Sequence, residues 1–385
     1  MKSETRVLVA GGGIGGLTLA VALRRAGMQV TVLERAPEWR PLGAGITVQM
    51  NAMLALRGLG LDEKVAAEGE RVRTSAVLDA AGRTLSGMPF AALEEEVGVP
   101  SICIHRARLH GVLLEAAGAE NVRLGAGVQS YEERGEKIAA RLSDGSELEG
   151  DLLVGADGLR SVVRAQLLGE SPLRYSGYTS WRGVCRNEGL VAEGHVTESW
   201  GAGARFGIVP IGHDEVYWFC TANAPAGERD PEEGPHARLG ALFGKWHAPV
   251  GELLRRTAPE RILRTDILDR PPVKTWSRGR VTLLGDAAHP MTPNMGQGGC
   301  QAIEGAAVLA RCLQTHSAAS EALAAYERAR VERANGIVER SWSFGRVGQL
   351  KNPAAVFLRD AMVRLTPASV QAKALTKLMR FELGA

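Results

Sequence analysis

The stretch Val281-Thr-Leu-Leu-Gly-Asp-Ala-Ala-His-Pro-Met-Thr-Pro-Asn-Met-Gly-Gln-Gly-Gly-Cys-Gln301 decides the fold of this chain. Its first four residues form a short apolar run of the kind that makes a buried strand. A Gly-Asp pair ends that strand and leaves the carboxylate of Asp286 at its carboxyl end. Two prolines then keep the chain extended, and Gly296, Gly298 and Gly299 remove side chains from the loop, which lets a ligand approach the backbone closely.

A helix is predicted to begin directly at these glycines. Its first turn would present free N–H groups and the positive end of the helix dipole to the ligand. A planar ligand that gains negative charge during its chemistry, such as reduced flavin, suits this site. Either half of the motif alone would be typical of a plain strand-to-helix connection, but the combination favours a ligand site. The apolar residues that recur at helical spacing are Ile303, Ala306, Ala307, Ala310 and Leu313.

A second glycine-rich turn follows a strand predicted over residues 6–10. It is Gly11-Gly-Gly13-Ile-Gly-Gly16, and a helix over residues 17–26 and a strand over residues 30–34 come next. In such a βαβ unit the glycines permit the turn, close approach to a pyrophosphate and close helix packing. Glu34 ends the second strand, where a carboxylate can bind the hydroxyls of an adenosine ribose. The chain holds one such fingerprint, which predicts one tightly bound dinucleotide, FAD or NAD, and no second domain of this kind for a nicotinamide cofactor.

A third buried strand ends in Asp157-Gly158. With the two glycine-rich turns, and in the same order along the chain, this motif resembles the FAD-dependent aromatic hydroxylases, the single-component flavoprotein monooxygenases. The resemblance covers nearly the whole chain. It implies that the chain binds FAD and that NADH or NADPH, docked transiently, reduces it. O₂ then forms a flavin C4a-hydroperoxide, from which one oxygen atom passes to an aromatic, heteroaromatic or polyene-like small molecule by hydroxylation or epoxidation.

The same resemblance implies the residues of the FAD site. Asp286 would hold the ribityl chain, Arg106 would reach the FAD phosphates, and Pro293 would shape the oxygen pocket as a catalytic residue. Arg108 is the local competitor of Arg106 and is expected to be solvated on the helix surface, and His289 is expected to pack structurally. The full predicted cofactor-binding set is Gly11, Gly13, Ile14, Gly15, Gly16, Glu34, Arg35, Gly45, Arg106, Asp157, Asp286, Gly296, Gln297, Gly298 and Gly299.

Between residues 175 and 268 the apolar pattern changes to a period of two, with turns about every ten residues. This pattern predicts the strands of a mixed or antiparallel sheet. Much of the aromatic content of the chain lies here. A sheet with aromatic side chains on one face, laid over a flavin, would make a flat apolar substrate cavity. For most of these aromatic residues, however, simple core packing is expected.

Two residues of this predicted sheet, Arg205 and Tyr217, are candidate catalytic residues. The segments around them resemble the flavin-dependent urate hydroxylases, in which the matching arginine and tyrosine lie at the substrate, and relatives similar to zeaxanthin epoxidases share part of the pattern. Antiparallel pairing across residues 211–215 places Tyr217 opposite Val209, so Arg205 and Tyr217 share one face. An inward arginine would pair with an oxygen of a planar heteroaromatic or polyene-like substrate. A structural role for the pair is the open alternative.

The predicted fold class is α/β. A FAD-binding Rossmann-like domain, discontinuous in sequence, carries an inserted mixed β-sheet substrate domain and C-terminal helices. The FAD-binding domain is assigned to residues 1–72, 101–172 and 274–340. The substrate domain is assigned to residues 73–100 and 173–273, and the C-terminal helical segment to residues 341–385.

The composition is that of an ordinary globular protein. The 385 residues are 45% hydrophobic and 23% charged, and the net charge of +3 is spread along the chain, so no nucleic-acid partner is predicted. Five cysteines without a Cys-x-x-Cys pair argue against a disulfide scaffold or a metal site and for a reducing cytoplasm. No signal peptide is expected before the first strand, and no apolar run approaches the ~20 residues of a membrane span.

The C-terminal segment combines a basic charge with an apolar stripe. Residues 341–385 hold seven Lys or Arg against two Asp or Glu. Packing on the rest of the protein with a basic solvent face is the favoured interpretation. The alternatives are contact with a second protomer, in a chain expected to be a monomer or a dimer, and peripheral contact with an anionic membrane that holds a lipophilic substrate.

Three other functions would fit some of the same sequence motifs. A flavin oxidase or reductase would carry the same FAD motifs but insert no oxygen atom. An NAD-dependent dehydrogenase would hold no yellow chromophore. A non-catalytic, partner-binding flavoprotein would bind FAD and never consume NAD(P)H.

Overall fold

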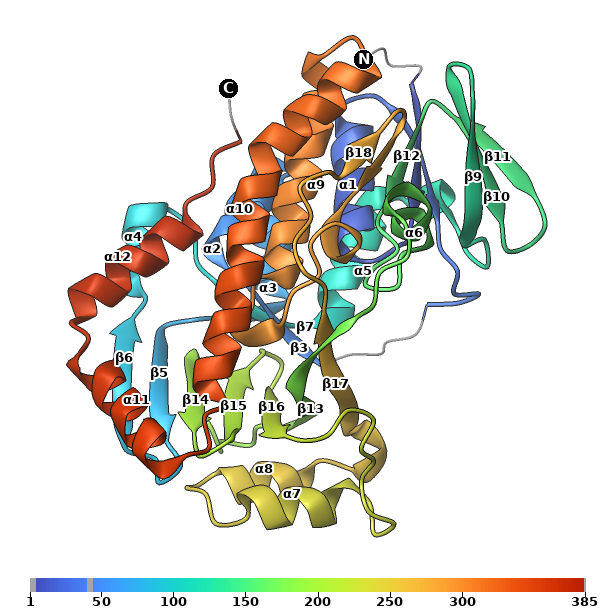
Figure 1. Cartoon of the computed structure of the whole chain (residues 1–385). Helices are drawn as coiled ribbons and strands as arrows, with labels where there is room; N and C mark the ends of the chain where they lie inside the picture. The colour runs from blue at the N-terminus through green and yellow to red at the C-terminus, as the bar shows by residue number, and fades with distance from the viewer. Residues whose placement is uncertain (1–4, 40–43, 384–385) are drawn as a thin grey trace.

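The structure is a computed structural model that describes residues 5–39 and 44–383. Two large sheets dominate it, with a long helix, α10, running beside both (Figure 1). The predicted α/β architecture, with a Rossmann-like parallel sheet and a second, mixed sheet, is confirmed.

The first large sheet has six strands. Its central strands are parallel and almost entirely apolar, because helices cover a parallel sheet on both faces. The short strand β18 is antiparallel to its neighbour. In spatial order the strands are β18 (Ser277–Arg278), β19 (Val281–Leu283), β12 (Leu152–Gly155), β1 (Arg6–Ala10), β2 (Gln29–Leu33) and β8 (Val122–Arg123).

Helices pack around this sheet and carry its glycine-rich turns. α9 packs against both α1 and α10, and α5 packs against α1. Their bounds are α1 (Ile14–Arg25), α5 (Arg106–Ala117), α6 (Val162–Leu168), α9 (Gly298–Thr315) and α10 (Ala319–Gly348). Helices α2 (Met50–Gly58) and α3 (Asp62–Ala67) connect two strands of a small sheet described below, and α4 (Ala91–Val97) leads from the seven-stranded sheet back to it.

The second large sheet has seven strands and is mixed, because β14 pairs with β5 in parallel and the other pairs are antiparallel. In spatial order the strands are β17 (Leu263–Asp269), β13 (Arg174–Arg186), β16 (Glu215–Asn223), β15 (Ala204–Pro210), β14 (His195–Trp200), β5 (Thr74–Asp79) and β6 (Thr84–Pro89).

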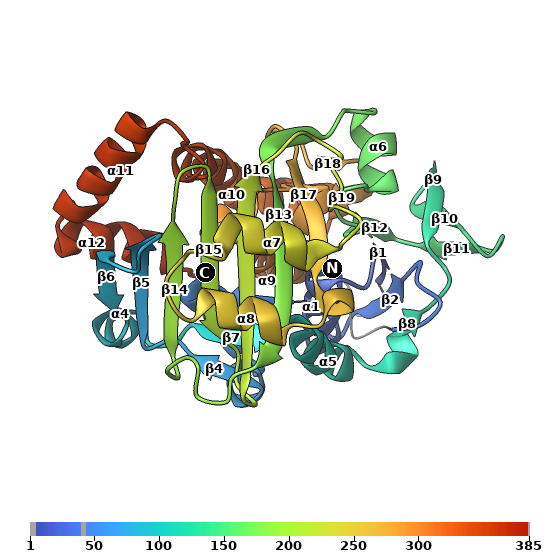
Figure 2. The same ribbon diagram turned by 90° about the horizontal axis from the view of Figure 1, so that it is seen from below.

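Helices α7 (Pro235–Phe243) and α8 (Val250–Arg256) cover one face of this seven-stranded sheet (Figures 1 and 2). Trp181, Phe206 and Trp218 are completely buried in the core between that face and the two helices. Core packing, expected for most aromatic residues of the sheet, is therefore confirmed for these three. The opposite face, with Tyr217 and Phe219, packs toward the six-stranded region.

The predicted strand register is also confirmed. Val209 pairs with Tyr217 and Arg205 pairs with Thr221, so Arg205 and Tyr217 share a face four residues apart. The turn over residues 211–215 sets this register, because a one-residue slip would move every side chain to the other face.

Two small sheets complete the fold. One consists of β9 (Val128–Arg134), β10 (Lys137–Leu142) and β11 (Glu147–Gly150), and the other of β3 (Gly45–Val48), β7 (Ile102–His105) and β4 (Gly69–Arg71). Short 3₁₀ turns are η1 (Ala119–Asn121), η2 (Pro259–Arg261), η3 (Gly285–Ala287) and η4 (Pro293–Met295). The C-terminal helices α11 (Pro353–Leu365) and α12 (Ala368–Met379) lie at the outer edge beyond β6 (Figures 1 and 2).

The domain boundaries stay a prediction. Strands β5 and β6 belong to the seven-stranded sheet, in keeping with the assignment of residues 73–100. Helix α10 runs without interruption across the boundary placed between residues 340 and 341. All five cysteines are buried and free, and within residues 5–39 and 44–383 no group of acidic, histidine or cysteine side chains is arranged to hold a metal ion. The helices in those ranges are too short or too polar to cross a membrane.

Candidate functional site

The first glycine turn, between β1 and α1, has the shape that the sequence predicts. Gly11 has a φ of +102°, and a Cβ atom there would lie 2.5 Å from the carbonyl oxygen of Ala156, so only glycine fits. A Cβ atom at Gly13 would meet nothing within 4 Å. No side chain caps α1, so no capping side chain accepts a hydrogen bond from the N–H groups of its first turn. This geometry fits the pyrophosphate of a dinucleotide.

Glu34 lies at the end of β2, beside this turn. Its carboxylate accepts hydrogen bonds from the backbone N–H groups of Gly12 (2.7 Å) and Ala36 (2.8 Å). The position fits the predicted contact with a ribose, which stays a prediction, as does a contact from the exposed side chain of Arg35.

Two aromatic side chains that sequence reasoning missed close one side of the turn. The rings of Trp39 and His110 lie 4.6 Å apart, and Nε2 of His110 is 2.8 Å from the carbonyl oxygen of Gly12. A Cβ atom on Gly12 would touch the Trp39 ring at 2.5 Å. No motif in the sequence marks either residue, because their proximity depends on how α5 packs against α1.

Asp157 caps a helix. Its carboxylate accepts hydrogen bonds from the Ser161 hydroxyl (2.5 Å) and from the backbone N–H of Val162 (2.8 Å), at the start of α6. Burial raises the pKa of its carboxyl group, against the opposing effect of these hydrogen bonds. The Cα atom of Asp157 lies next to Gly11, so the residue is at the dinucleotide turn, and its predicted contact with FAD stays a prediction.

The Gly-Asp turn, η3, holds Asp286 in solvent opposite Arg106. Asp286 is accessible, yet protein atoms surround it closely enough that desolvation raises the pKa of its carboxyl group, while the Arg106 charge lowers it. No described residue donates a hydrogen bond to this carboxylate. An exposed acceptor with an arginine close by fits both assigned roles, contact with a ribityl chain and contact with phosphates, which stay predictions.

Arg164, on α6, holds the Gly-Asp turn η3 by hydrogen bonds to its backbone. Its buried guanidinium donates from Nη1 to the carbonyl oxygens of Ala287 (2.8 Å) and Ala288 (3.0 Å). Burial, together with the charge of Arg270, lowers the pKa of Arg164. The sequence placed an arginine here, but nothing in its spacing showed that it holds the Asp286 turn.

His289 is buried beside Trp276, with ring centroids 5.3 Å apart. Neither ring nitrogen has a hydrogen-bond partner within the described part of the chain. Burial, and then the charge of Arg330, lowers the pKa of His289 to about 3. The imidazole is therefore neutral at physiological pH, in agreement with the expected packing role.

The second glycine loop packs directly against β3 and the seven-stranded sheet. Gly296 has a φ of +62°, and a Cβ atom on Gly299 would lie 2.9 Å from the Ile46 side chain. The ring of Tyr217 covers Gly45, because a Cβ atom on Gly45 would lie 2.5 Å from that ring. No side chain caps α9, so the loop presents backbone N–H groups between β3 and the turn of Pro293, whose ring is exposed.

Gln297, predicted to bind the cofactor, has a side chain that points into the protein. Its side chain is completely buried, and its amide bonds to Gln49 (2.6 Å) and Asn51 (2.9 Å). The side chain thus points into the protein, away from the loop surface, and a contact with the cofactor through its backbone stays a prediction.

A buried ionic network lies behind Gln297. The carboxylate of Glu304, on α9, accepts hydrogen bonds from Arg330 (2.5 Å) and Arg333 (2.8 Å), both on α10, and from Asn51 (2.5 Å). Burial alone would raise the pKa of Glu304, but the hydrogen bonds and charges of the two arginines hold it below the usual value. The network fixes the glycine loop to α10 through side chains 26 or more residues apart in sequence, which is why no local motif revealed it.

Arg205 is almost completely buried, with 2% of its surface exposed. All three guanidinium nitrogens donate to side chains: Nε to Gln349 (3.2 Å), Nη1 to Glu198 (3.0 Å) and Nη2 to Asn294 (2.6 Å). Asn294 follows Pro293 in η4, so Arg205 connects the sheet to the predicted oxygen pocket. The substrate contact assigned to Arg205 stays a prediction, and these bonds favour the positioning alternative.

Tyr217 is half-buried between Gly45 and the sheet. Burial, opposed by the nearby charge of Arg182, raises the pKa of its phenol to about 12. The hydroxyl is therefore neutral at physiological pH and can donate a hydrogen bond. Its substrate contact stays a prediction.

Arg108, expected to be solvated, is not. Its guanidinium pairs with the Glu215 carboxylate and donates to the carbonyl oxygen of Ile211 (3.1 Å). Helix α5 packs close enough to the turn of the seven-stranded sheet for this arginine to bind two of its residues, a tertiary contact that a helix-surface pattern does not encode. Arg106, in contrast, is exposed, as its assigned role requires.

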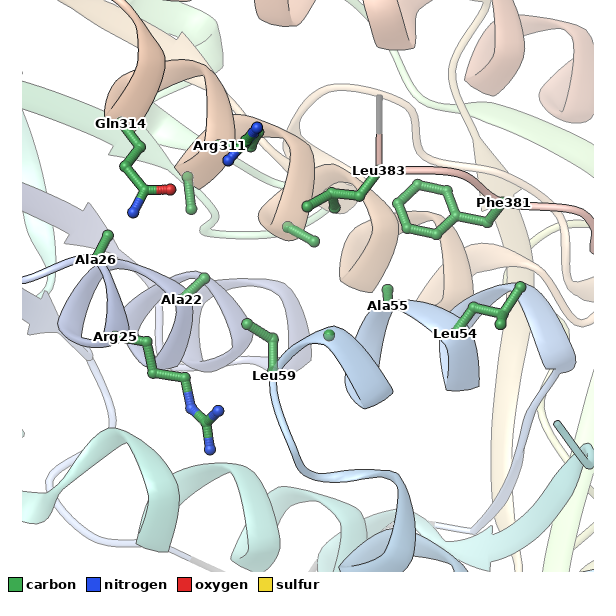
Figure 3. Close-up of a pocket in the computed structure, with 13 residues that line it drawn as sticks. Ala22, Arg25, Ala26, Leu54, Ala55, Leu59, Arg311, Gln314, Phe381 and Leu383 are labelled. Carbon is green, nitrogen blue, oxygen red and sulfur yellow. The ribbon is translucent and has the colours of Figure 1, made fainter. Parts of the chain in front are cut away.

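A separate cavity of about 340 Å³ lies among α1, α2, α9 and the C-terminal residues Phe381 and Leu383 (Figure 3). It includes Arg25, at the last turn of α1, whereas the glycine turn precedes the first. At ~1.5 Å per residue, the length of α1 separates the two. The cavity is therefore distinct from the dinucleotide turn.

Comparison with known proteins shows that residues 4–341 match the FAD binding domain family. An aurachin C monooxygenase/isomerase of Stigmatella aurantiaca is 53% identical over 95% of both chains. A FAD-dependent urate hydroxylase of Mycolicibacterium vanbaalenii is 36% identical over 90% of both. A 2-heptyl-3-hydroxy-4(1H)-quinolone synthase of Pseudomonas aeruginosa is 36% identical over 94% of both.

A solved structure shows the same arrangement of elements. The crystal structure of Klebsiella pneumoniae HpxO complexed with FAD and uric acid superimposes with a TM-score of 0.92, at 30% identity, over 97% of this chain and 96% of that one.

Proposed function

The chain belongs to the FAD binding domain family and is an FAD-dependent monooxygenase that uses NAD(P)H and O₂, and we propose that its substrate is a planar quinolone that carries a long apolar chain. The observation that carries the proposal is the 53% identity with an aurachin C monooxygenase/isomerase over 95% of both chains. The 36% identity with a 2-heptyl-3-hydroxy-4(1H)-quinolone synthase points to the same class of ring.

The face of the sheet that holds Tyr217 supports an apolar planar substrate. Val209 and Phe219 flank Tyr217 on this face, and all three are apolar or aromatic. The guanidinium of Arg205 is bound by protein side chains on every nitrogen, so a substrate that depends on an arginine pair would have to displace them. A fused ring that packs by dispersion and needs few hydrogen bonds suits this surface better.

The proposed polar contact is with the ring carbonyl. Arg182 lies on the same face, opposite Phe219, and its charge acts on the Tyr217 phenol. The neutral hydroxyl of Tyr217 donates to the carbonyl oxygen, and the half-buried Arg182 favours the enolate-like form of the ring, in which the carbon beside that carbonyl is electron-rich enough to accept the oxygen atom. Both residues would orient the ring.

Bound FAD would activate O₂, and the oxygen atom that is transferred comes from O₂. The protein contributes the surroundings. The uncapped first turn of α9 favours negative charge developing on the ligand beside it. Pro293, held through Asn294 by Arg205, and the sheet above it exclude water from the reaction.

The proposed delivery of reducing power is by a docked, loosely held NAD(P)H, because the one dinucleotide fingerprint serves FAD. We also propose a cytoplasmic location and a monomer or dimer, with the basic C-terminal segment as the region that meets a membrane. Titration of the purified protein should show weak, substrate-dependent nicotinamide binding, and a tightly held second dinucleotide in the resting protein would contradict this.

A substrate panel tests the proposed substrate. The FAD-loaded protein should oxidise NADH or NADPH faster with 2-heptyl-4(1H)-quinolone or aurachin C than without, and in ¹⁸O₂ the product should gain one ¹⁸O atom. Urate is the competing candidate, favoured by the match to the HpxO–uric acid complex. Stimulation by urate and by neither quinolone would overturn the proposal, and hydrogen peroxide without an oxygenated product would identify an oxidase.

A further inference from the structure

We propose that the outward face of helix α11 docks the enzyme on an anionic membrane surface. This face, called the α11 face below, consists of Phe357, Leu358, Met362 and Leu365. Their exposed fractions are 73%, 61%, 71% and 80%, the four highest among the large exposed apolar residues of the described chain. Contiguous exposed apolar surface of this kind marks an interaction site.

Helix geometry places these four side chains on one side. At 100° per residue, Phe357, Leu365, Leu358 and Met362 span about 140° of the helix circumference. The polar side chain of Arg359 lies on the opposite side and is buried. Helix α11 therefore has the reverse of the orientation that a surface helix of a soluble protein normally takes.

Specific contacts fix this orientation. Nη1 of Arg359 donates to the carbonyl oxygens of Gly201 (3.0 Å) and Gly348 (3.2 Å), and its guanidinium lies 5.3 Å from the Trp200 ring. The side chain of Asn352 accepts hydrogen bonds from the first N–H groups of the helix. Turning the apolar side inward would break the contacts of Arg359 with Gly201, Gly348 and Trp200, so the α11 face is a built feature of the fold.

The position of the helix makes the face available. α11 and α12 form one outer edge of the molecule beyond β6 (Figures 1 and 2). The Ser86 hydroxyl of β6 donates to Gln371 of α12 (2.5 Å), which anchors this edge. Val370, in the first turn of α12, is also more than half exposed. A flat surface can therefore reach the face without obstruction from the sheet.

The positive charges beside the α11 face favour an anionic partner. Lys351, Arg364 and Lys373 flank the face and are exposed. The one acidic residue from 351 to 373, Asp360, is paired with Arg359 (2.8 Å). Arg364 forms a long ion pair with Asp79 (3.7 Å), and the Asp79 carboxylate pairs more closely with Arg83 (2.7 Å). Exposed apolar side chains bordered by cations are the features of a helix that lies in the interface of an anionic bilayer.

A second copy of the chain fits this face less well. A twofold axis through the α11 face would bring the flanking cations of both copies together, and like charges oppose association. A bilayer with anionic headgroups instead pairs with the cations and buries the apolar side chains. The link to substrate delivery rests on the proposed function, since a quinolone with a long chain partitions into membranes, but the docking surface itself does not.

Cosedimentation with vesicles tests the inference. The FAD-loaded enzyme should bind vesicles of phosphatidylglycerol and phosphatidylcholine, should bind pure phosphatidylcholine at least tenfold more weakly, and should dissociate in 0.5 M NaCl. The double variant Phe357→Ser/Leu365→Ser should lose at least tenfold in binding. The matched control is Leu263→Ser, an exposed leucine (39%) on β17, which should bind as the wild type does.

Three results would overturn the inference: no binding of the wild type to either vesicle, equal loss in the Leu263→Ser control, or a dimer that the double variant dissociates. Retained FAD content establishes that the variants are folded. Turnover of a short-chain, water-soluble quinolone should be unchanged in the double variant, while turnover of a vesicle-held long-chain quinolone falls. Vesicle binding without turnover of any quinolone would contradict the proposed substrate and leave the docking surface standing.

Discussion

The loop from Gly285 to Gly299 has two neighbours with different chemistry. On the cofactor side, the turns of α1 and α9 present backbone N–H groups that no side chain caps. On the sheet side, the candidate residues Arg205 and Tyr217 present side chains, and Arg205 donates hydrogen bonds to Glu198, Asn294 and Gln349. The backbone N–H groups of these two turns lack side-chain partners because the glycines of the motifs carry no side chains that could cap them. A side chain's partners, in contrast, depend on which distant elements pack around it.

Removing the network behind the cofactor side gives the largest expected effect. Glu304→Ala leaves the buried Arg330 and the partly buried Arg333 without their carboxylate partner, and breaking a buried pair such as Arg330–Glu304 costs about 3–5 kcal/mol. Urea unfolding of the FAD-free protein measures the loss. Glu147→Ala, which breaks an exposed pair with Arg134, is the matched control and should destabilise the protein far less, because water and salt screen an exposed pair. Equal effects in the two variants would show that the network is not a support of the loop.

Removing the carboxylate on the cofactor side should affect the ligand and spare the fold. Asp286→Ala removes a charged acceptor that no described residue uses, a hydrogen bond worth about 1.5–3 kcal/mol to FAD. The dissociation constant for FAD, measured by flavin fluorescence, should rise by roughly 10–150-fold, with unchanged unfolding of the FAD-free protein. Asp144→Ala, in a hairpin turn, is the control. Unchanged FAD affinity would mean that Asp286 is wrongly assigned.

Arg205→Ala tests the sheet side. It removes three hydrogen bonds and leaves the Glu198 carboxylate without its arginine, so a loss of about 1–3 kcal/mol in unfolding free energy is expected. Oxygen insertion should fall and hydrogen peroxide should rise, because Asn294 and the Pro293 turn lose their link to β15, while FAD content stays intact. Arg238→Ala, at a half-exposed pair with Glu228, controls for the loss of an arginine. Wild-type coupling of NAD(P)H to product in Arg205→Ala would argue against a positioning role.

Tyr217→Phe should give the smallest effect and separates binding from folding. It removes one hydroxyl and leaves the ring that packs on Gly45. A lost hydrogen bond of about 0.5–1.5 kcal/mol predicts a KM for the substrate up to roughly tenfold higher, without a change in thermal unfolding. Tyr131→Phe, on β9, is the control. An unchanged KM would leave Tyr217 with a packing role alone.

The cofactor side could be predicted in detail because its function is carried by local sequence. The tight turn at Gly11, the room for a ligand beside the glycines and the position of Asp286 at the carboxyl end of a strand were expected from residue types at fixed spacing. The pairing of Val209 with Tyr217 followed from the position of a turn, since the side-chain period of a strand is two.

Side-chain partners on the other side could not be predicted. Arg108 pairs with Glu215, 107 residues away, and Gln297 turns inward to Asn51. The α11 stripe was visible as a pattern, but periodicity does not tell which side of a helix faces the protein. The buried Arg359 decides that, through carbonyl groups of β14–β15 and α10.

The sequence by itself determined the family, the FAD-binding turns, the two-sheet architecture and the strand register, because each depends on backbone geometry set by neighbouring residues. Only the tertiary structure decided that Arg205 anchors the Pro293 turn, that Glu304 supports the glycine loop and that α11 turns its apolar side outward. The physical reason is that buried polar groups must find partners, and those partners come from whichever distant elements the packing brings within hydrogen-bond reach.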